Sequence, residues 1–237
     1  MKQFVNLVIE GPDGSGKSTL VKKLSTWMNK IGYVVTTTRH PGSTQLGQKI
    51  RELVKHESIP ITDFNRQLLM MIDLTQFIEQ ILIPAYKSSQ EDNKGRVVIS
   101  DRSNIISGII YGKASGLSDD MIKLIYAPVF FLNPPPMDVI ILKSSWETLS
   151  KRQHHDVDNG VEKKCYFELK GSEFHKSVIK FYDDFYKIKT KFHDQSSSSI
   201  YYVDCSSSEE EVFDSVKSIL LKSVLPSPSF PEQSSHS

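Results

Sequence analysis

One segment near the N-terminus constrains the fold of this 237-residue chain more than any other. Residues 11–18 read Gly-Pro-Asp-Gly-Ser-Gly-Lys-Ser and fit the pattern G-x-x-x-x-G-K-[ST]. In that pattern, glycines let backbone N–H groups turn toward phosphate oxygens, the lysine adds a cation, and the hydroxyl binds Mg²⁺. The segment lies between a short apolar run at 4–9 and a stretch with helical spacing at 18–30, which is the context the pattern needs. We therefore predict a nucleoside triphosphate site at Gly11, Pro12, Asp13, Gly14, Ser15, Gly16, Lys17, Ser18 and Thr19.

Short apolar or β-branched segments alternate with helical patterns along the rest of the chain. Further strands are predicted at 33–38, 97–100, 139–142 and 200–203. Helices are predicted at 44–55, at 63–88 with an apolar face through Leu68, Ile72, Phe77 and Ile81, and from a capping box of Ser206 and Glu209 to about Leu220. This alternation indicates an α/β fold, a doubly wound five-stranded parallel sheet with helices on both faces. Ligands of such sheets bind beyond the carboxyl ends of the strands.

Composition narrows the class of protein. The 29 Lys and Arg residues almost balance 28 Asp and Glu residues, which argues against a polybasic nucleic-acid binder. Apolar runs shorter than the roughly 18–20 residues of a membrane span, and no signal-peptide pattern, predict a soluble protein without membrane partners. Its expected location is the cytoplasm, or the host cytoplasm if the protein is viral. Two cysteines, Cys165 and Cys205, are too few for a disulfide framework or zinc cluster.

Charged residues follow two of the predicted strands. Arg39 and Pro41 come after the second strand, and Asp101 and Arg102 follow the third. An aspartate at a strand end beside a phosphate-binding loop is placed to hold a Mg²⁺ water, as the Ser18 hydroxyl is placed to bind the ion. An adjacent arginine is placed to grip a second phosphate with two parallel hydrogen bonds. The alternative for Asp101 and Arg102 is an ion pair at the start of a loop.

In the order and spacing of these motifs, the chain resembles the thymidylate kinases, a family of nucleoside-monophosphate kinases. The resemblance runs from about Phe4 to Leu221 and rests on 9–19, 39–51, Asp101-Arg102, Lys151-Arg152, Phe167-Glu168 and Tyr182. It implies a single P-loop kinase domain over 1–224, with a short lid at about 153–167. It also implies a homodimer that uses ATP and Mg²⁺ to convert dTMP to dTDP. The tail at 225–237, rich in Ser and Pro, is predicted to be disordered.

The resemblance also assigns roles to individual residues. Arg39 and Arg102 would hold the acceptor phosphate, and Asp13 would contact the acceptor sugar. Arg152 would lie against the adenine of ATP, while Lys163 and Lys164 in the lid would fold over the transferring phosphoryl group. With Lys17 and Asp101, Arg39 and Arg102 make up the predicted catalytic set. The acceptor-nucleotide set is Asp13, Arg39, Pro41, Met70, Asp73, Arg102, Ser107 and Tyr111.

The chain departs from the family where the acceptor base binds. Met70 stands where the family has phenylalanine, and Leu74 where it has the arginine that bonds the base. Methionine still packs against a flat ring, but leucine cannot replace a donor. The lid from Arg152 to Glu168 also lacks further arginines. One explanation is divergence with dTMP retained. Another is a different acceptor, such as a 5-modified dUMP or several deoxynucleotides. From another class, a non-catalytic nucleotide-binding module remains open.

Overall fold

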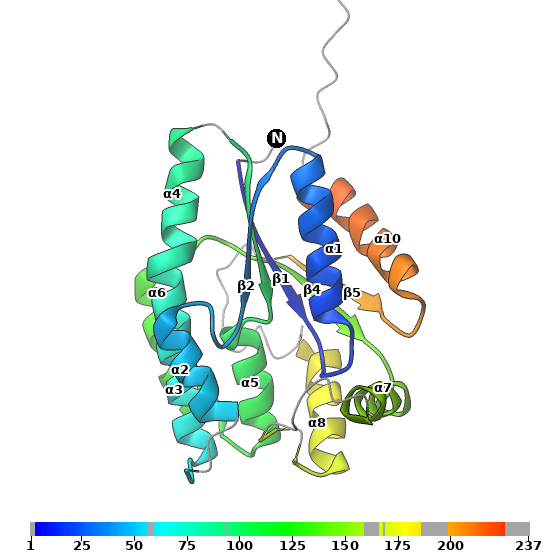
Figure 1. Ribbon diagram of the computed structural model, residues 1–237. Helices are drawn as coiled ribbons and strands as arrows, with labels where there is room; N and C mark the ends of the chain where they lie inside the picture. The colour runs from blue at the N-terminus through cyan, green and yellow to red at the C-terminus, as the bar shows by residue number, and fades with distance from the viewer. Residues whose placement is uncertain are drawn as a thin grey trace, which may run out of the picture.

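A computed structural model describes residues 3–55, 59–92, 94–158, 166–167, 169–185 and 199–225, with only the backbone described at 153–158. Within these residues, five strands form one parallel sheet in the order β2-β3-β1-β4-β5 (Figure 1). The strands are β1 (Phe4–Glu10), β2 (Val34–Arg39), β3 (Arg96–Asp101), β4 (Asp138–Lys143) and β5 (Ile200–Asp204). The predicted fold class is confirmed, and each predicted strand lies within two residues of its observed bounds.

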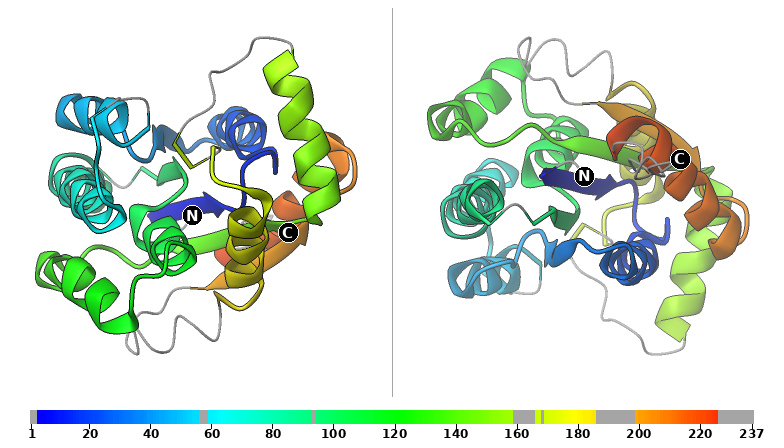
Figure 2. Two further views of the ribbon diagram at one scale, coloured as in Figure 1. Left: turned by 90° about the horizontal axis from the view of Figure 1, so that it is seen from below. Right: turned by 90° about the horizontal axis from the view of Figure 1, so that it is seen from above.

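Helices cover both faces of the sheet. The first group comprises α1 (Lys17–Lys30), α10 (Glu209–Ile219) and the π-helix η2 (Leu220–Val224), which pack together over one face. The opposite face carries α3 (Asp63–Phe77), the π-helix η1 (Ile78–Leu82), α4 (Ile83–Glu91), α5 (Asn104–Ala114), α6 (Asp119–Leu132) and α8 (Ser172–Asp183). Figure 2 shows α1 and α10 on the other side of β1 from α5 and α6. Two more helices, α2 (Gln45–Lys55) and α7 (Trp146–Asp158), lie near the carboxyl ends of the strands (Figure 1).

The helix over 63–88 was predicted correctly, but its buried face only in part. The predicted Phe77 is buried in the core and Ile81 packs against it, whereas Leu68 and Ile72 are 39% and 47% exposed and Met71 and Leu74 are buried in their place. Both sides of this helix carry large apolar residues, so periodicity alone could not identify the inner one. The continuous helix Asp63–Glu91 is also long and apolar enough to cross a membrane by length and composition, which the sequence reading missed. Its buried side chains belong to the core, as expected for a central helix of a globular fold.

The predicted start of the last helix is also wrong. The capping box that opens α10 is formed by Ser208 and Glu211, not by Ser206 and Glu209. The Ser208 hydroxyl accepts from the Glu211 amide at 3.3 Å, and the Glu211 carboxylate accepts from the Ser208 amide at 3.0 Å. Residues 153–158, which fall in the predicted lid, continue α7 as helix. The tail from 226 and residues 159–165 of the predicted lid lie outside the described residues.

Candidate functional site

The phosphate-binding loop joins the end of β1 to the start of α1. Gly14 and Gly16 have φ angles of 80° and 84°, a left-handed conformation that glycine adopts without steric cost. The Ser15 amide donates to the Pro12 carbonyl at 3.4 Å, which tightens the turn. The loop therefore presents the N-terminus of a 14-residue helix, where free N–H groups and the helix dipole favour a bound phosphate.

Lys17 reaches back into this loop. Its ammonium donates to the Pro12 carbonyl at 2.7 Å and to the Ser15 hydroxyl at 3.3 Å. Burial, together with the nearby charge of Arg102, lowers the pKa of Lys17 to about 8. When a phosphate binds, its oxygens would accept the hydrogen bonds that the Lys17 ammonium now donates to these two oxygens. The lysine is therefore placed as the sequence motif predicted, as a cation inside the loop.

Ser18 and Asp101 meet at the carboxyl edge of the sheet. The Ser18 hydroxyl donates to the Asp101 carboxylate at 2.6 Å, and Asp101 ends β3 directly beside Ile9 of β1. Mg²⁺ is usually held by one or two such oxygen groups together with substrate phosphates and waters. Among the described residues, no cluster of three or more His, Cys, Asp or Glu side chains suggests another metal site.

A large open pocket lies on one side of the loop. It has a volume of about 630 Å³, within the range of nucleotide and drug sites, and is formed by the loop, α1, the middle of α7 and the start of α10. The predicted residues Thr19 and Arg152 line it. Cys205, Ser207 and Ser208 line it too, and the sequence reading missed them. Their signal was their place directly after β5, at the same edge of the sheet.

Arg102 occupies the other side of the loop. Its guanidinium donates to the Gly11 carbonyl at 2.7 Å and the Tyr182 hydroxyl at 2.9 Å, and it pairs with the Asp13 carboxylate. Burial raises the pKa of Asp13, but Arg102, Lys17 and Lys55 outweigh this effect and hold the pKa well below its usual value. Arg102 has a φ of 71°, which non-glycine residues rarely adopt, so contacts around it must hold the backbone in place.

Glu10 holds that backbone, and sequence reasoning gave it no role. It is fully buried at the end of β1, where its carboxylate accepts from the Ser103 amide at 2.7 Å and the Tyr182 hydroxyl at 2.8 Å. Burial raises the pKa of Glu10, while Arg102 and these hydrogen bonds oppose the rise. A buried acid directly before the loop was visible in the sequence, but its partners lie far away in the chain.

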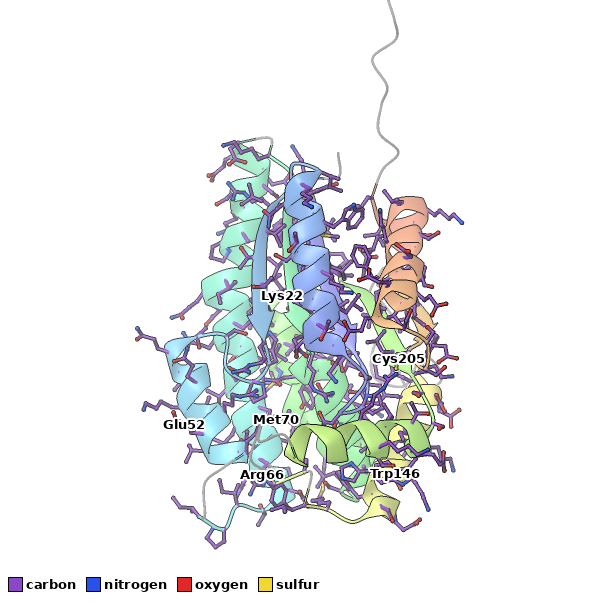
Figure 3. The ribbon with its side chains drawn as sticks, turned by 45° about the vertical axis from the view of Figure 1, so that its right-hand side comes forward. Lys22, Glu52, Arg66, Met70, Trp146 and Cys205 are labelled. Atoms are coloured by element: carbon purple, nitrogen blue, oxygen red, sulfur yellow. The ribbon has the colours of Figure 1, made fainter. Side chains whose placement is uncertain are left out.

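The predicted acceptor residues Asp13, Pro41, Met70, Arg102, Ser107 and Tyr111 line one pocket, together with His40, Val54, Lys55 and Phe167. The Tyr111 and Phe167 rings meet edge to face at 5.0 Å. The cavity between these side chains is about 30 Å³, room for about one water molecule, so a nucleotide must displace some of them. Figure 3 shows Met70 and Arg66 near each other, at the same lower end of the molecule as α7.

Some predicted residues are not brought into this pocket. Arg39 is exposed at the end of β2, paired in register with Asp101, and does not line the pocket. Asp73 is fully buried beneath the loop after β2, where it accepts from the Gly42 amide at 3.1 Å and from Asn104 at 2.7 Å. Leu74 packs in the core. Lys163 and Lys164 lie outside the described residues.

Comparisons with known proteins all point to the same family. The sequence model of the thymidylate kinase family matches residues 9–216. The thymidylate kinase of Caldicellulosiruptor saccharolyticus is 30% identical over 216 residues, covering 90% of this chain and 94% of that protein. That of Chlorobium phaeobacteroides is 30% identical over 192 residues, covering 73% and 85%, and that of Mesoplasma florum is 26% identical over 219 residues, covering 92% and 95%.

Proposed function

The chain belongs to the thymidylate kinase family, and we propose that it transfers the γ-phosphoryl group of ATP to dTMP, giving ADP and dTDP. One observation carries this assignment: the phosphate-binding loop separates two pockets. Gly14 and Gly16 line the large pocket, while Asp13, in the same loop, lines the narrow one with Arg102. A phosphoryl group held by the loop would therefore face a second phosphate held by Arg102. Phosphoryl transfer needs mainly such positioning and charge stabilisation.

We assign the large pocket to ATP and the narrow one to the monophosphate. Lys17 and the loop amides bind the β and γ phosphates, and Arg152 lies on the nucleoside side. Arg102 binds the acceptor phosphate, assisted by Arg39 from the rim and by Lys163 or Lys164 from the lid. Met70, Ser107 and Tyr111 contact the acceptor nucleoside, and Asp13 its sugar. Asp73 supports this side of the pocket through the loop that contains Pro41.

Ser18 and Asp101 are the proposed Mg²⁺ residues. Their adjacent hydroxyl and carboxylate oxygens suit a hard cation that shares its remaining positions with water and phosphate. The ion would neutralise charge between the β and γ phosphates, as in other phosphotransferases. We propose that the enzyme works in the cytoplasm, where ATP and nucleoside monophosphates are available.

The test is ADP release with Mg-ATP against dTMP, dUMP, 5-hydroxymethyl-dUMP, dCMP, dGMP, dAMP and UMP. We expect turnover to require a monophosphate and to be highest with dTMP. Turnover that favours another monophosphate would move the acceptor and leave the phosphoryl-transfer chemistry in place. ADP release that is independent of every monophosphate would refute the kinase assignment.

A homodimer is also proposed, because α3 and α6 present an apolar face to solvent. Leu68 and Ile72 lie one turn apart on α3, and Met121, Leu124 and Phe131 recur at helical spacing on α6. Leu124 and Phe131 are 72% and 90% exposed. The two helices contact each other, so these side chains belong to one region, of a kind that usually marks an interaction site. A second copy would cover it through the same face, as two-fold symmetry requires.

Replacing Leu124 with aspartate is expected to shift the protein from dimer to monomer in light scattering coupled to gel filtration. The buried carboxylate would lose its water without gaining a partner. Leu221→Asp is the matched control, because Leu221 is 46% exposed on η2, on the opposite face of the sheet. A wild-type monomer, or a Leu124→Asp variant that stays dimeric, would contradict this interface.

A further inference from the structure

Contacts along α3 show which end of the acceptor pocket lies near the phosphate-binding residues and which end lies away from them. Asp73 on α3 bonds the loop after β2 and Asn104 of α5, close to the strand ends that carry the phosphate-binding residues. Met70, about one turn earlier, lines the pocket. One further turn earlier, Arg66 donates to the Val54 carbonyl at the end of α2. With a rise of about 1.5 Å per residue, Arg66 lies roughly 10 Å from Asp73 along the helix. The end of α2 is therefore at the far end of the pocket, where a base would lie.

Lys55 is the last residue of α2 and lines the acceptor pocket together with Val54 and Phe167. Its carbonyl accepts from the Tyr166 amide at 3.0 Å, which fixes its backbone against the segment that carries Phe167. The positive charge of Lys55 helps to lower the pKa of Asp13, which lines the same pocket. Within the described part of the chain, the Lys55 ammonium forms no ion pair. It is therefore a cation of the pocket wall that is available to a ligand.

The other polar groups nearby are occupied. The Ser107 hydroxyl donates to the Ser103 carbonyl at 2.7 Å. The Arg66 guanidinium lies 3.5 Å from the centre of the Tyr166 ring, and Arg66 is not among the residues lining the pocket. Arg102 is engaged at the phosphate end. Of the described side chains at the far end, Lys55 is the one placed to donate to a base.

We propose that Lys55 determines acceptor specificity by donating its ammonium to a carbonyl oxygen on the edge of the base. The proposal rests on the proposed function and names the group that reads the acceptor. An ammonium has three donors and no acceptor, so it favours a base that presents a carbonyl. It disfavours a base that presents an amino group at the same position. Thymine carries a carbonyl at C4, where cytosine carries an amino group, and Lys55 selects the first.

The experiment compares dTMP with dCMP, by kcat/KM and by calorimetric binding, in wild type, Lys55→Met, Lys55→Arg and Lys49→Met. Losing one charged hydrogen bond is expected to lower kcat/KM and affinity for dTMP by about 10–100-fold in Lys55→Met, and for dCMP by less than about threefold. Lys55→Arg keeps the donor charge and should retain the preference for dTMP. Lys49 is exposed on the same helix, paired with Glu52, so Lys49→Met should behave as wild type.

An unchanged dTMP to dCMP ratio in Lys55→Met would overturn the proposal. An equal loss for both nucleotides would also overturn it, because Lys55 would then contact the phosphate or sugar that both share. If Lys55→Met fails to fold, a Lys55→Gln variant tests the same ratio, since its amide both donates and accepts and should narrow the preference. Failure of the proposed function is a separate result: wild type would bind or discriminate the two nucleotides without releasing ADP.

Discussion

Replacing Lys17 with alanine is expected to lower kcat/KM by at least ~10²–10³-fold, the scale of losing one preorganised charge contact in a transition state. The Lys17 ammonium lies inside the phosphate-binding loop, 2.7 Å from the Pro12 carbonyl. Phosphate binding exchanges that carbonyl for phosphate oxygens and requires little movement. Steady-state ADP release with varied ATP measures the effect. Lys22→Ala is the matched control, because Lys22 is exposed on the same helix (Figure 3).

The pH dependence of ATP binding distinguishes this role from a merely structural one. The pKa of Lys17 is lowered to about 8, and bound phosphates must raise it, because anions favour the charged form. ATP affinity should therefore be full below pH 8 and fall as the pH rises, by up to ~10-fold per pH unit. Lys17→Ala should lack this fall. Activity near the wild-type level in Lys17→Ala, or an alkaline fall that persists in it, would contradict the assignment.

The sheet was predictable because its signals are local. Short β-branched or apolar runs marked each strand, and the glycine-rich loop fixed the first strand–helix unit. The errors arose where local signals were degenerate. Ser206, Ser207 and Ser208 are each followed three residues later by a glutamate, so three capping boxes fit the sequence, and the structure forms the one at Ser208. On α3, Leu68 and Met70 are equally apolar, and contact with α5 and α6 decides which side is buried.

The candidate site was predictable where its residues follow strand ends, because parallel strands bring those ends together. The sequence placed Asp101 and Arg102 beside the phosphate-binding loop, and the structure places them there. It gave no signal for Lys55, which reaches the acceptor pocket from the end of a helix. Glu10 was equally silent, since its role depends on Tyr182, 172 residues away in the chain. Long-range pairings of this kind leave no periodicity or spacing to detect.

Replacing Arg102 with alanine is expected to lower kcat/KM for dTMP by at least ~10²–10³-fold, again the scale of one transition-state charge contact. Arg102 pairs with Asp13 in this structure, and the acceptor phosphate would take that position as the stronger, bidentate partner. Arg102→Lys should recover only part of the loss, because an ammonium cannot reproduce the planar fork. Arg96→Ala is the control, because Arg96 begins the same strand at the end away from the phosphate-binding loop and pairs with Asp92.

The Arg102→Ala variant should also change the ATP site, where the expected effect is a higher pKa of Lys17 and not a loss of ATP affinity. The positive charge of Arg102 contributes to the lowered pKa of Lys17, whereas Asp13, Asp101 and Glu10 act to raise it. Removing Arg102 leaves these three carboxylates acting on Lys17, so the pKa of Lys17 should rise. ATP should then bind as tightly as in wild type at neutral pH and keep its affinity to higher pH, while transfer to dTMP is lost. Loss of ATP affinity at neutral pH would instead mean that Arg102 supports the phosphate-binding loop itself. The two pockets would then not be separable as the geometry indicates.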